Sequence, residues 1–486
     1  MLLLLAIPAL FVGNQACTPC HDAICRTYGV TPMAMSSGRS LPALAPGSIR
    51  HDASKVGYDI DTRGLVRLSR GERQQQRQLS YYIGSGVAGR SFAYLRDGFL
   101  FEAPITWYTQ TGSWDVSPGY ASDTVSRWSR PIEPSCLFCH ASQTRWREGT
   151  VNAYGEPAFG QNGVACERCH GPGSLHVEGK AKMVNPAQLA PARRDGVCAQ
   201  CHLTGRSRVA RAGRQLRDYR AGDLLSDYVA YFVPAGDADF QVNSHVEKLA
   251  RSGCKLAAGD RLWCGTCHDP HTVPASSERA RWFRGRCLTC HEETQCGRGF
   301  DCAGCHMPKN PAADAVHGVF TDHSIPRLPG RARPQPAASW TLHGFSAADS
   351  GDRELGLAYA EIGVRTGNAR EQAEAVRLLT AAPQDAEIEV RLADLQERAG
   401  NPARALALYQ GALRQDPDAV IAMVNLGRLY GSSGLLERAI ALWREALKRN
   451  PCLAEAGANL QIALRAKGDT AGAEAVRHSQ EFCTFE

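Results

Sequence analysis

The arrangement of hydrophobic and polar positions first indicates a β-rich stretch. Residues 91–95 and 99–103 are short apolar, aromatic-rich runs separated by Arg96-Asp97-Gly98. An Asp-Gly pair between two such runs is a strong signal for a β-hairpin, because both central residues of its tight turn take positive φ. A third run, 105–108, follows Pro104, which is expected at the edge or start of a strand. The pattern therefore predicts a small β insert.

Residues 351–486 carry a helical pattern that repeats. Pro383, Pro417 and Pro451 recur every 34 residues, the period of tetratricopeptide repeats. Apolar residues hold matching positions in two successive units: Leu392, Ala393, Ala405, Tyr409 and Ala412 in the first, and Leu426, Gly427, Tyr430, Ala439, Trp443 and Ala446 in the second. Weaker units are expected from about residue 352 and about residue 454. Stacked helix pairs bury a continuous apolar seam, so we predict an α-solenoid.

The remaining stretches have little periodicity. Residues 326–350 are rich in Pro among basic and small residues, which favours a linker. Leu2–Val12 is an apolar run of the length of a signal-peptide core, and it is too short to span a bilayer. It lacks the basic segment that precedes such a core, which is expected if the leader is truncated. The predicted organisation is a signal peptide (1–16), a first segment with the β insert (17–135), a cysteine-rich module (136–325), a linker (326–350) and a repeat domain (351–486).

Seven copies of Cys-x-x-Cys-His are the main chemical signal in the chain. Random placement of 19 Cys and 15 His would give roughly 0.02 copies. This motif is the attachment signature of c-type haem: two thiols form thioether bonds to one haem, and the adjacent His is the proximal iron ligand. The thiol pairs are Cys17/Cys20, Cys136/Cys139, Cys166/Cys169, Cys198/Cys201, Cys264/Cys267, Cys287/Cys290 and Cys302/Cys305. The proximal ligands are His21, His140, His170, His202, His268, His291 and His306. We therefore predict seven covalently bound haem c groups.

Distal ligands decide whether a haem only transfers electrons or can also bind a small molecule. Six histidines outside the motifs are candidates: His51, His176, His245, His271, His317 and His323. His176 and His271 follow the proximal His of their own motif too closely to reach the same iron, so each is expected to serve a neighbouring haem. His478 lies in the repeat tail and is expected to be structural.

One iron, which we assign to the first motif, then lacks a histidine. Met33 or Met35 could coordinate it through its thioether and give a site of higher potential, with Met33 as the first candidate. Alternatively, Met33 is a packing residue and the haem is open or bound by His343. Zinc fits less well than haem, because the number of motifs is odd and each is followed at once by His. Five cysteines outside the motifs can pair or stay free: Cys25, Cys254, Cys296, Cys452 and Cys483.

Composition narrows the functional classes. With 55 Lys and Arg against 49 Asp and Glu, the net charge is +6, and charged residues make up only 21% of the chain. No basic block with interleaved aromatic residues occurs, which argues against nucleic-acid binding. Nineteen cysteines would be unusual in a cytosolic enzyme. We expect a periplasmic or otherwise exported protein without a firm membrane anchor.

The motifs and the residues after them resemble exported multihaem cytochromes related to the tetrahaem cytochrome c of nitrifying bacteria. The resemblance is carried by Cys166-Glu-Arg-Cys169-His170-Gly-Pro-Gly-Ser-Leu-His176, Cys264-Gly-Thr-Cys267-His268-Asp-Pro-His271 and Cys302-Ala-Gly-Cys305-His306-Met-Pro308. It covers about residues 17–330, and some relatives also carry a tetratricopeptide tail. It implies that His176, His271 and His323 are axial ligands of neighbouring haems. The chain departs from relatives that have Ser-x-His after the first motif, since it has Thr31-Pro32-Met33.

The predicted fold is mainly α with much irregular structure: a multihaem cytochrome c module with a small β insert, followed by a tetratricopeptide α-solenoid. The expected function is electron transfer between redox partner proteins, with protein docking through the tail. One alternative is a multihaem oxidoreductase acting on a small nitrogen or sulfur compound at one open haem. Another is an assembly scaffold with structural haems. No group stands out as a catalytic residue, which favours an electron-transfer protein over an enzyme.

Overall fold

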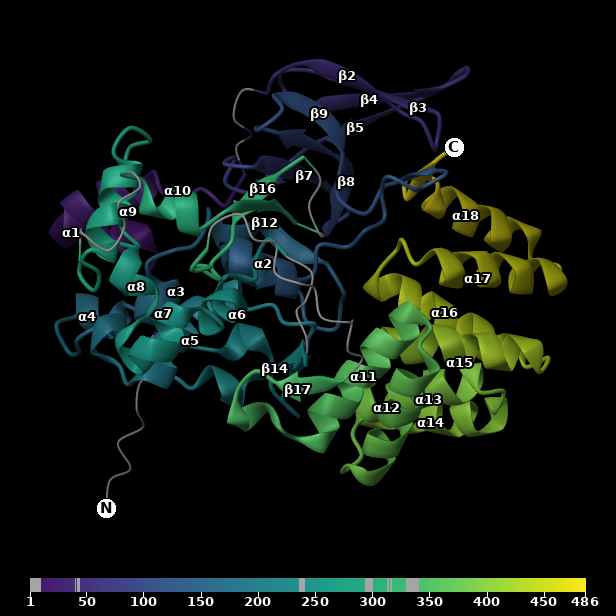
Figure 1. The fold of residues 1–486 in the computed structure, drawn as a ribbon. Helices are drawn as coiled ribbons and strands as arrows, with labels where there is room; N and C mark the ends of the chain where they lie inside the picture. Colours follow the sequence, from purple (N-terminus) through teal and green to yellow (C-terminus); the bar gives the residue numbers. More distant parts are fainter. Residues whose placement is uncertain are drawn as a thin grey trace.

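The computed structural model describes residues 10–39, 41, 44–235, 241–292, 300–312, 314, 317–328 and 341–486. Figure 1 shows three regions: a β-domain (β1–β9, residues 37–116), a module that carries the Cys-x-x-Cys-His motifs, and an arc of helices. The arc starts beside the module, and its C-terminal end returns to the β-domain. None of the helices in these described ranges is long and apolar enough to cross a membrane.

The β-domain is larger than the hairpin insert that the sequence pattern indicated. One antiparallel sheet has the order β1 (Ser37–Gly38), β6 (Tyr81–Ile83), β7 (Gly89–Arg96), β8 (Phe99–Tyr108) and β9 (Ser113–Val116). The other is a meander of β2 (Gly47–His51), β3 (Val56–Ile60), β4 (Leu65–Arg70) and β5 (Arg73–Gln78). Tyr58, Leu68, Phe92 and Phe101 are buried in a core that the two sheets share.

The predicted hairpin at Asp97-Gly98 is confirmed. Asp97 and Gly98 have φ of 51° and 85°, and Arg96 pairs with Phe99 across the turn. Pro104 lies inside β8 rather than at a strand edge or start. The β7–β8 register shifts between Ser91 and Ala93, so the ladder is irregular opposite Pro104, which has no N–H to donate. Residues 105–108 therefore continue β8 instead of forming a separate strand.

The motif module consists of short elements joined by loops, as expected from its weak periodicity. Its helices are α1 (Asn14–Gly29), α2 (Pro134–His140), α3 (Glu167–His170), α4 (Ser174–Val177), α5 (Pro191–His202), α6 (His245–Ala250), α7 (Gly253–Ala258), α8 (Cys264–Cys267), α9 (Arg279–Cys287) and α10 (Cys302–His306). Short 3₁₀ turns are η1 (Pro186–Gln188), η2 (Leu216–Asp218), η3 (Leu225–Asp227) and η4 (Gly259–Arg261). Its strands are β10 (Ser126–Arg127), β11 (Ser142–Trp146), β12 (Tyr154–Gln161), β13 (Ser207–Ala210), β14 (Val229–Pro234), β15 (Lys309–Pro311) and β16 (Val319–Thr321).

The tail forms four stacked helix pairs, which include both strong and both weak predicted units. The pairs are α11 (Asp352–Thr366) with α12 (Ala369–Ala381), α13 (Ala386–Arg398) with α14 (Pro402–Gln415), α15 (Val420–Ser432) with α16 (Leu436–Arg449), and α17 (Ala454–Ala466) with α18 (Thr470–Gln480). Each pair turns at a glycine with positive φ: Gly367, Gly400, Gly434 and Gly468. Glycine takes this conformation without the Cβ strain of other residues, so these positions mark the repeat.

Gly427 provides a direct test of the repeat packing. A Cβ atom at this position would lie 2.6 Å from Nε1 of Trp443, whose N–H donates to the carbonyl of Val424. Gly427→Val is therefore expected to lower the free energy of unfolding by about 1–3 kcal/mol through overpacking. Urea unfolding followed by circular dichroism measures this loss. Ala458→Val, at an exposed position of α17, is the control and is expected to have a much smaller effect; equal effects would contradict this packing.

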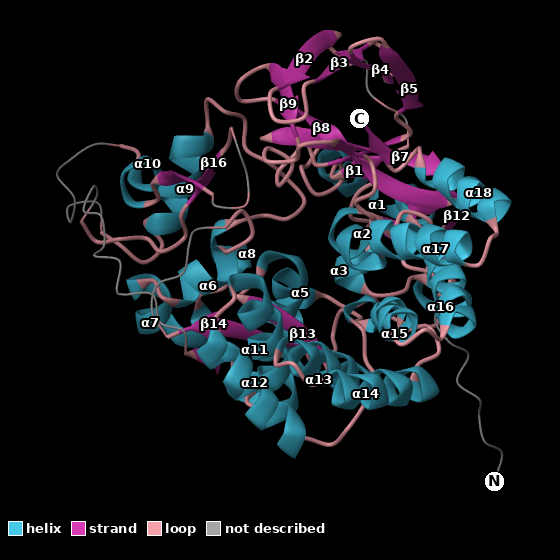
Figure 2. Cartoon of the chain, turned by 90° about the vertical axis from the view of Figure 1, so that its right-hand side faces the viewer, coloured by secondary structure: helices cyan, strands magenta, loops and turns pink. Residues whose placement is uncertain are grey.

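The tail joins the motif module through a shared sheet and an ion network. β17 (Leu342–Gly344), at the end of the predicted linker, pairs with β14, and the sheet β13-β14-β17 packs on α11. Figure 2 shows β13 and β14 beside α11. Residues 342–350, which include the 3₁₀ turn η6 (Ala347–Asp349), are thus structured, whereas Pro329, Pro334 and Pro336 lie outside the described residues.

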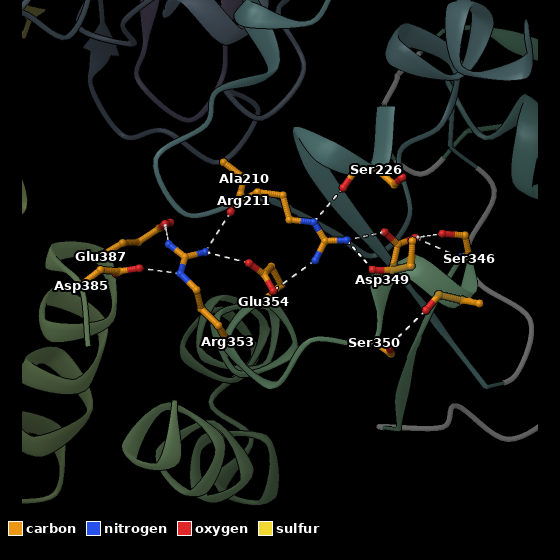
Figure 3. A network of polar contacts seen from close by, with 12 residues as sticks. Ala210, Arg211, Ser226, Ser346, Asp349, Ser350, Arg353, Glu354, Asp385 and Glu387 are labelled. Atoms are coloured by element: carbon orange, nitrogen blue, oxygen red, sulfur yellow. Dashed lines mark hydrogen bonds and ion pairs between the residues drawn. The ribbon is translucent and has the colours of Figure 1, made fainter. Parts of the chain in front are cut away.

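Two arginines form ion pairs at this contact between the tail and the motif module (Figure 3). Arg211 contacts Asp349 at 3.3 Å and Glu354 at 3.2 Å, and it donates to the carbonyl of Ser226. Arg353 contacts Glu354, Asp385 and Glu387, and it donates to the carbonyl of Ala210. Asp349 and Glu354 are largely buried, so their charges would be costly without the arginine that pairs with them. These ion pairs therefore fix the tail to the module.

The other end of the tail is attached to the β-domain. β18 (Thr484–Phe485) pairs with β10, and Phe485 is buried in the β-domain core. A disulfide joins Cys452 to Cys483, so two of the five cysteines outside the motifs are paired. Cys25 and Cys254 are free, and Cys296 lies outside the described residues. The tail is therefore connected to the rest of the molecule at both ends.

Candidate functional site

All seven motifs, numbered 1 to 7 along the chain, fall in or at the end of a helical turn. Motifs 1, 2, 3, 4, 5 and 7 involve α1, α2, α3, α5, α8 and α10, and motif 6 starts at the last residue of α9. The N–H of His170 donates to the carbonyl of Cys166, and His268 and His291 donate in the same way within their motifs. Residues three and four apart on a helix share a face, so both thiols and the imidazole of a motif point to one side.

Thiols of different motifs lie close together. Four pairs of thiols lie close enough for one thiol to shift the pKa of the other: Cys17 with Cys166, Cys139 with Cys201, Cys198 with Cys264, and Cys287 with Cys302. These contacts connect motif 1 with 3, motif 2 with 4, motif 4 with 5, and motif 6 with 7. Motifs that are distant in sequence therefore form contiguous groups in the fold.

Some of the thiols predicted to bind haem differ from the rest in being exposed. Cys20 lies in residues 18–24, a stretch of α1 and its kink in which every residue is exposed. Cys290 lies in the turn that follows α9, where its Sγ atom is 3.8 Å from the Thr289 hydroxyl. These two thiols are exposed. Only the motif supports their role in haem attachment, which stays a prediction. The exposed motif thiols are Cys20, Cys136, Cys290 and Cys305.

Three pairs of histidine rings face each other at a spacing that suits one metal between them. The centroid distances are 6.4 Å for His21 and His176, 5.9 Å for His170 and His271, and 6.2 Å for His268 and His323. The interplanar angles are 22°, 14° and 31°. Two imidazoles on opposite sides of one metal ion place their centroids roughly 6 Å apart, because a metal–nitrogen bond is about 2 Å long.

The hydrogen bonds of these rings leave the other ring nitrogen available. Nδ1 of His170 lies 2.7 Å from the carbonyl oxygen of Val184, and Nδ1 of His176 lies 3.2 Å from that of Ala181. Nδ1 of His323 lies 3.0 Å from the carbonyl of Thr321, and Nδ1 of His306 lies 2.9 Å from that of Pro326. An imidazole that donates from Nδ1 presents Nε2 to a metal, and metal-ligating histidines usually have such a partner. The donor set thus fits axial haem coordination.

His245 lies between two other histidines. Its ring is 5.1 Å from His202 and 4.7 Å from His323, at steep angles in both cases. Burial, together with the neighbouring imidazoles, lowers the pKa of His245 to about 3. Burial likewise lowers the pKa of His140, His170, His202, His268 and His323. These imidazoles are therefore neutral near pH 7, the form in which histidine binds a metal.

Three other sequence candidates have different surroundings. His51 lies in the β-domain, and both of its ring nitrogens are engaged: Nδ1 with the Ser54 hydroxyl at 2.8 Å and Nε2 with the Ala121 carbonyl at 3.0 Å. Nε2 of His317 lies 2.5 Å from the Asp115 carboxylate, and its ring packs edge-on against Tyr108. His343 is exposed on β17. The structure does not bring these three to a motif histidine in a described ring contact.

The segment around Met33 packs against motif 2 and beside motif 3. The Ser36 hydroxyl donates to the carbonyl of His140, and the N–H of Val164 donates to the carbonyl of Met33. His176 occupies the position opposite His21. His478, expected to be structural, is exposed on α18 and contacts Glu481.

Glu167 and Arg168 were not singled out from the sequence, although motif 3 alone has charged residues at both x positions. The Glu167 carboxylate is buried and accepts the N–H groups of Val12, Gly13 and Gly173, each at 2.8 Å. Residues 10–16, part of the predicted signal peptide, thus contact motif 3. Within the part of the chain that the structure describes, no group of three or more His, Cys, Asp or Glu side chains is arranged to hold a bare metal ion.

Comparison with known proteins concerns the tail. A tetratricopeptide repeat family model matches residues 390–454. Similar solved structures include MamA (18% identity, 26% of this chain and 75% of that chain, TM-score 0.23) and YrrB, described as a TPR protein with an unusual peptide-binding site (17%, 26% and 67%, 0.23). A human IFIT1 dimer is another (18%, 26% and 32%, 0.23). No curated protein matches the chain. The family match identifies tetratricopeptide repeats, a domain type that mediates protein–protein interaction.

Proposed function

We propose that this protein is an exported heptahaem c-type cytochrome that carries electrons between redox partner proteins. The observation that carries the proposal is the set of three opposed histidine pairs, each joining a motif histidine to a histidine from another part of the chain. A motif histidine with a second imidazole opposite it is the ligand arrangement of a six-coordinate haem, which transfers electrons without binding a substrate.

Each part of the motif has a distinct role in this proposal. The two cysteines anchor a haem covalently, and the histidine pairs supply both axial ligands. Haem iron, when bound, supplies a one-electron ferric/ferrous couple. The carbonyls of Val184, Ala181 and Thr321 orient His170, His176 and His323. The Cys452–Cys483 disulfide supports an oxidising compartment.

The repeat tail is the proposed docking element for a redox partner. Since both of its ends are fixed, the tail would hold a partner in one orientation relative to the motifs. Fixed orientation favours electron transfer, because the distance between the redox groups of two proteins then stays constant.

A second candidate function is an oxidoreductase with one open haem at motif 2. Among the described residues, no imidazole stacks on His140, and the same is true of His306, whereas His21, His170 and His268 each have an opposed imidazole. The nearby segment of Met33 and Met35 offers thioethers instead of an imidazole. Turnover of nitrite or hydroxylamine by a high-spin haem of the wild type would favour this enzyme over the electron carrier.

The haem count tests the proposal directly. Denatured protein is expected to retain seven covalently bound haems per chain, because each motif offers two thioether bonds. A pyridine haemochrome assay combined with the intact mass measures this number. Cys302→Ser with Cys305→Ser should lower the count by one. A wild-type count of five or fewer would contradict the assignment of all motifs.

A further inference from the structure

Arg168 is a largely buried cation where motifs 2, 3 and 4 meet. It belongs to motif 3, and its guanidinium lies 4.2 Å from the ring centroid of Phe138 in motif 2. It is close enough to interact electrostatically with the thiols of Cys139, Cys169 and Cys201, one from each motif. One positive charge therefore faces three of the proposed haem attachment points.

No described carboxylate neutralises this charge. The Nε atom of Arg168 is buried without a hydrogen-bond partner, and no described Asp or Glu forms an ion pair with it. Glu167, its neighbour in sequence, points instead to the N–H groups of Val12, Gly13 and Gly173. A buried cation without a counter-charge is costly, which suggests a role beyond stability.

The side chains packed around the same thiols are cationic or neutral. Arg220 interacts with Arg168, and Arg208 interacts with the Cys139 thiol. Tyr219 and Tyr231, only 1% and 2% exposed, lie near Cys201, and their hydroxyls have no hydrogen-bond partner among the described residues. Asp223, which interacts with Tyr219, accepts a hydrogen bond from the Tyr228 hydroxyl. The charge of the described side chains around these thiols is thus positive, and burial strengthens its electrostatic effect.

We propose that Arg168 is a tuning residue that raises the reduction potentials of the haems at motifs 2, 3 and 4. A nearby positive charge disfavours the ferric state, which carries one more positive charge than the ferrous state, and low local polarity strengthens this effect. Electrons that enter the protein would therefore reside preferentially on the haems at motifs 2, 3 and 4. The inference rests on the proposed function, because it requires haem at these motifs.

Potentiometric titration of holoprotein variants tests this role. In Arg168→Gln, we expect the reduced-to-oxidised ratio of at least one haem at a fixed ambient potential to fall about tenfold, which corresponds to about 59 mV for a one-electron couple. Arg168→Lys keeps the charge and is expected to restore most of the ratio. Arg208→Gln, at an exposed position, should shift the same haem in the same direction by a smaller factor.

The matched control is Arg217→Gln. Arg217 also lies 4.2 Å from an aromatic ring centroid, that of Trp146, but is not among the groups that interact with the three thiols. Its titration curve should match the wild type. If Arg168→Gln and Arg208→Gln both titrate like the wild type while seven haems are present, the tuning role is wrong and the cytochrome proposal stands. If the wild type carries no covalent haem, both proposals fail.

Discussion

Replacing His176 with alanine is expected to convert one low-spin haem into a high-spin haem that binds CO. His176 faces His21 at a centroid distance of 6.4 Å, and its Nδ1 is directed to the carbonyl of Ala181. Loss of this ring would leave the motif 1 iron with a single axial ligand, an open position that a diatomic ligand can occupy. Absorption and electron paramagnetic resonance spectra of the purified protein, with and without CO, measure the change.

Two further variants decide between His176 and Met33 as the ligand. Met33→Ala is expected to leave the motif 1 haem low-spin, because the Met33 segment packs on motifs 2 and 3. His478→Ala, on the exposed face of the tail, should leave every haem unchanged. A high-spin haem in Met33→Ala together with a wild-type spectrum for His176→Ala would instead support Met33 as the ligand at motif 1.

Deleting residues 352–486 is expected to prevent the rest of the chain from folding, not only to weaken partner binding. The deletion uncovers Val209, Phe232 and Leu342, which pack with the buried residues of α11 to α13, and removes Phe485 from the β-domain core. Exposing each such side chain costs about 1.5–3 kcal/mol. Several losses of this size approach the total stability of a typical domain, about 5–15 kcal/mol. Soluble yield and thermal unfolding measure the effect.

A milder variant removes the disulfide within the C-terminal end of the tail. Cys452→Ser with Cys483→Ser is expected to lower the free energy of unfolding by about 2–4 kcal/mol while keeping the fold, because the bond restricts the unfolded chain. A truncated protein with wild-type spectra and an unchanged Tm would show that the tail is an independent module. The sequence pattern alone predicted that independence, since the repeat period ends at the Pro-rich segment before Asp352.

The repeat tail and the Asp97-Gly98 hairpin could be predicted because their signals are local. Helix and strand periodicity, the spacing of prolines and the positive φ of a turn depend on neighbours in the chain. The extent of the β-domain was less predictable. β5 has no apolar alternation, and Pro104 continues β8 because the ladder becomes irregular at that position.

The sequence by itself indicated the residues proposed to attach haem, since Cys-x-x-Cys-His is a local motif whose thiols and imidazole share one helical face. Only the tertiary structure decided which histidine faces which motif. His21 and His176, or His268 and His323, meet through folding of segments far apart in sequence, and the hydrogen bond between His51 and the Ala121 carbonyl is equally non-local. The same holds for the attachment of the tail, because β18 pairs with β10, from which it is separated by most of the chain. Contacts of this kind depend on how segments far apart in sequence pack together, and a short sequence motif does not encode this packing.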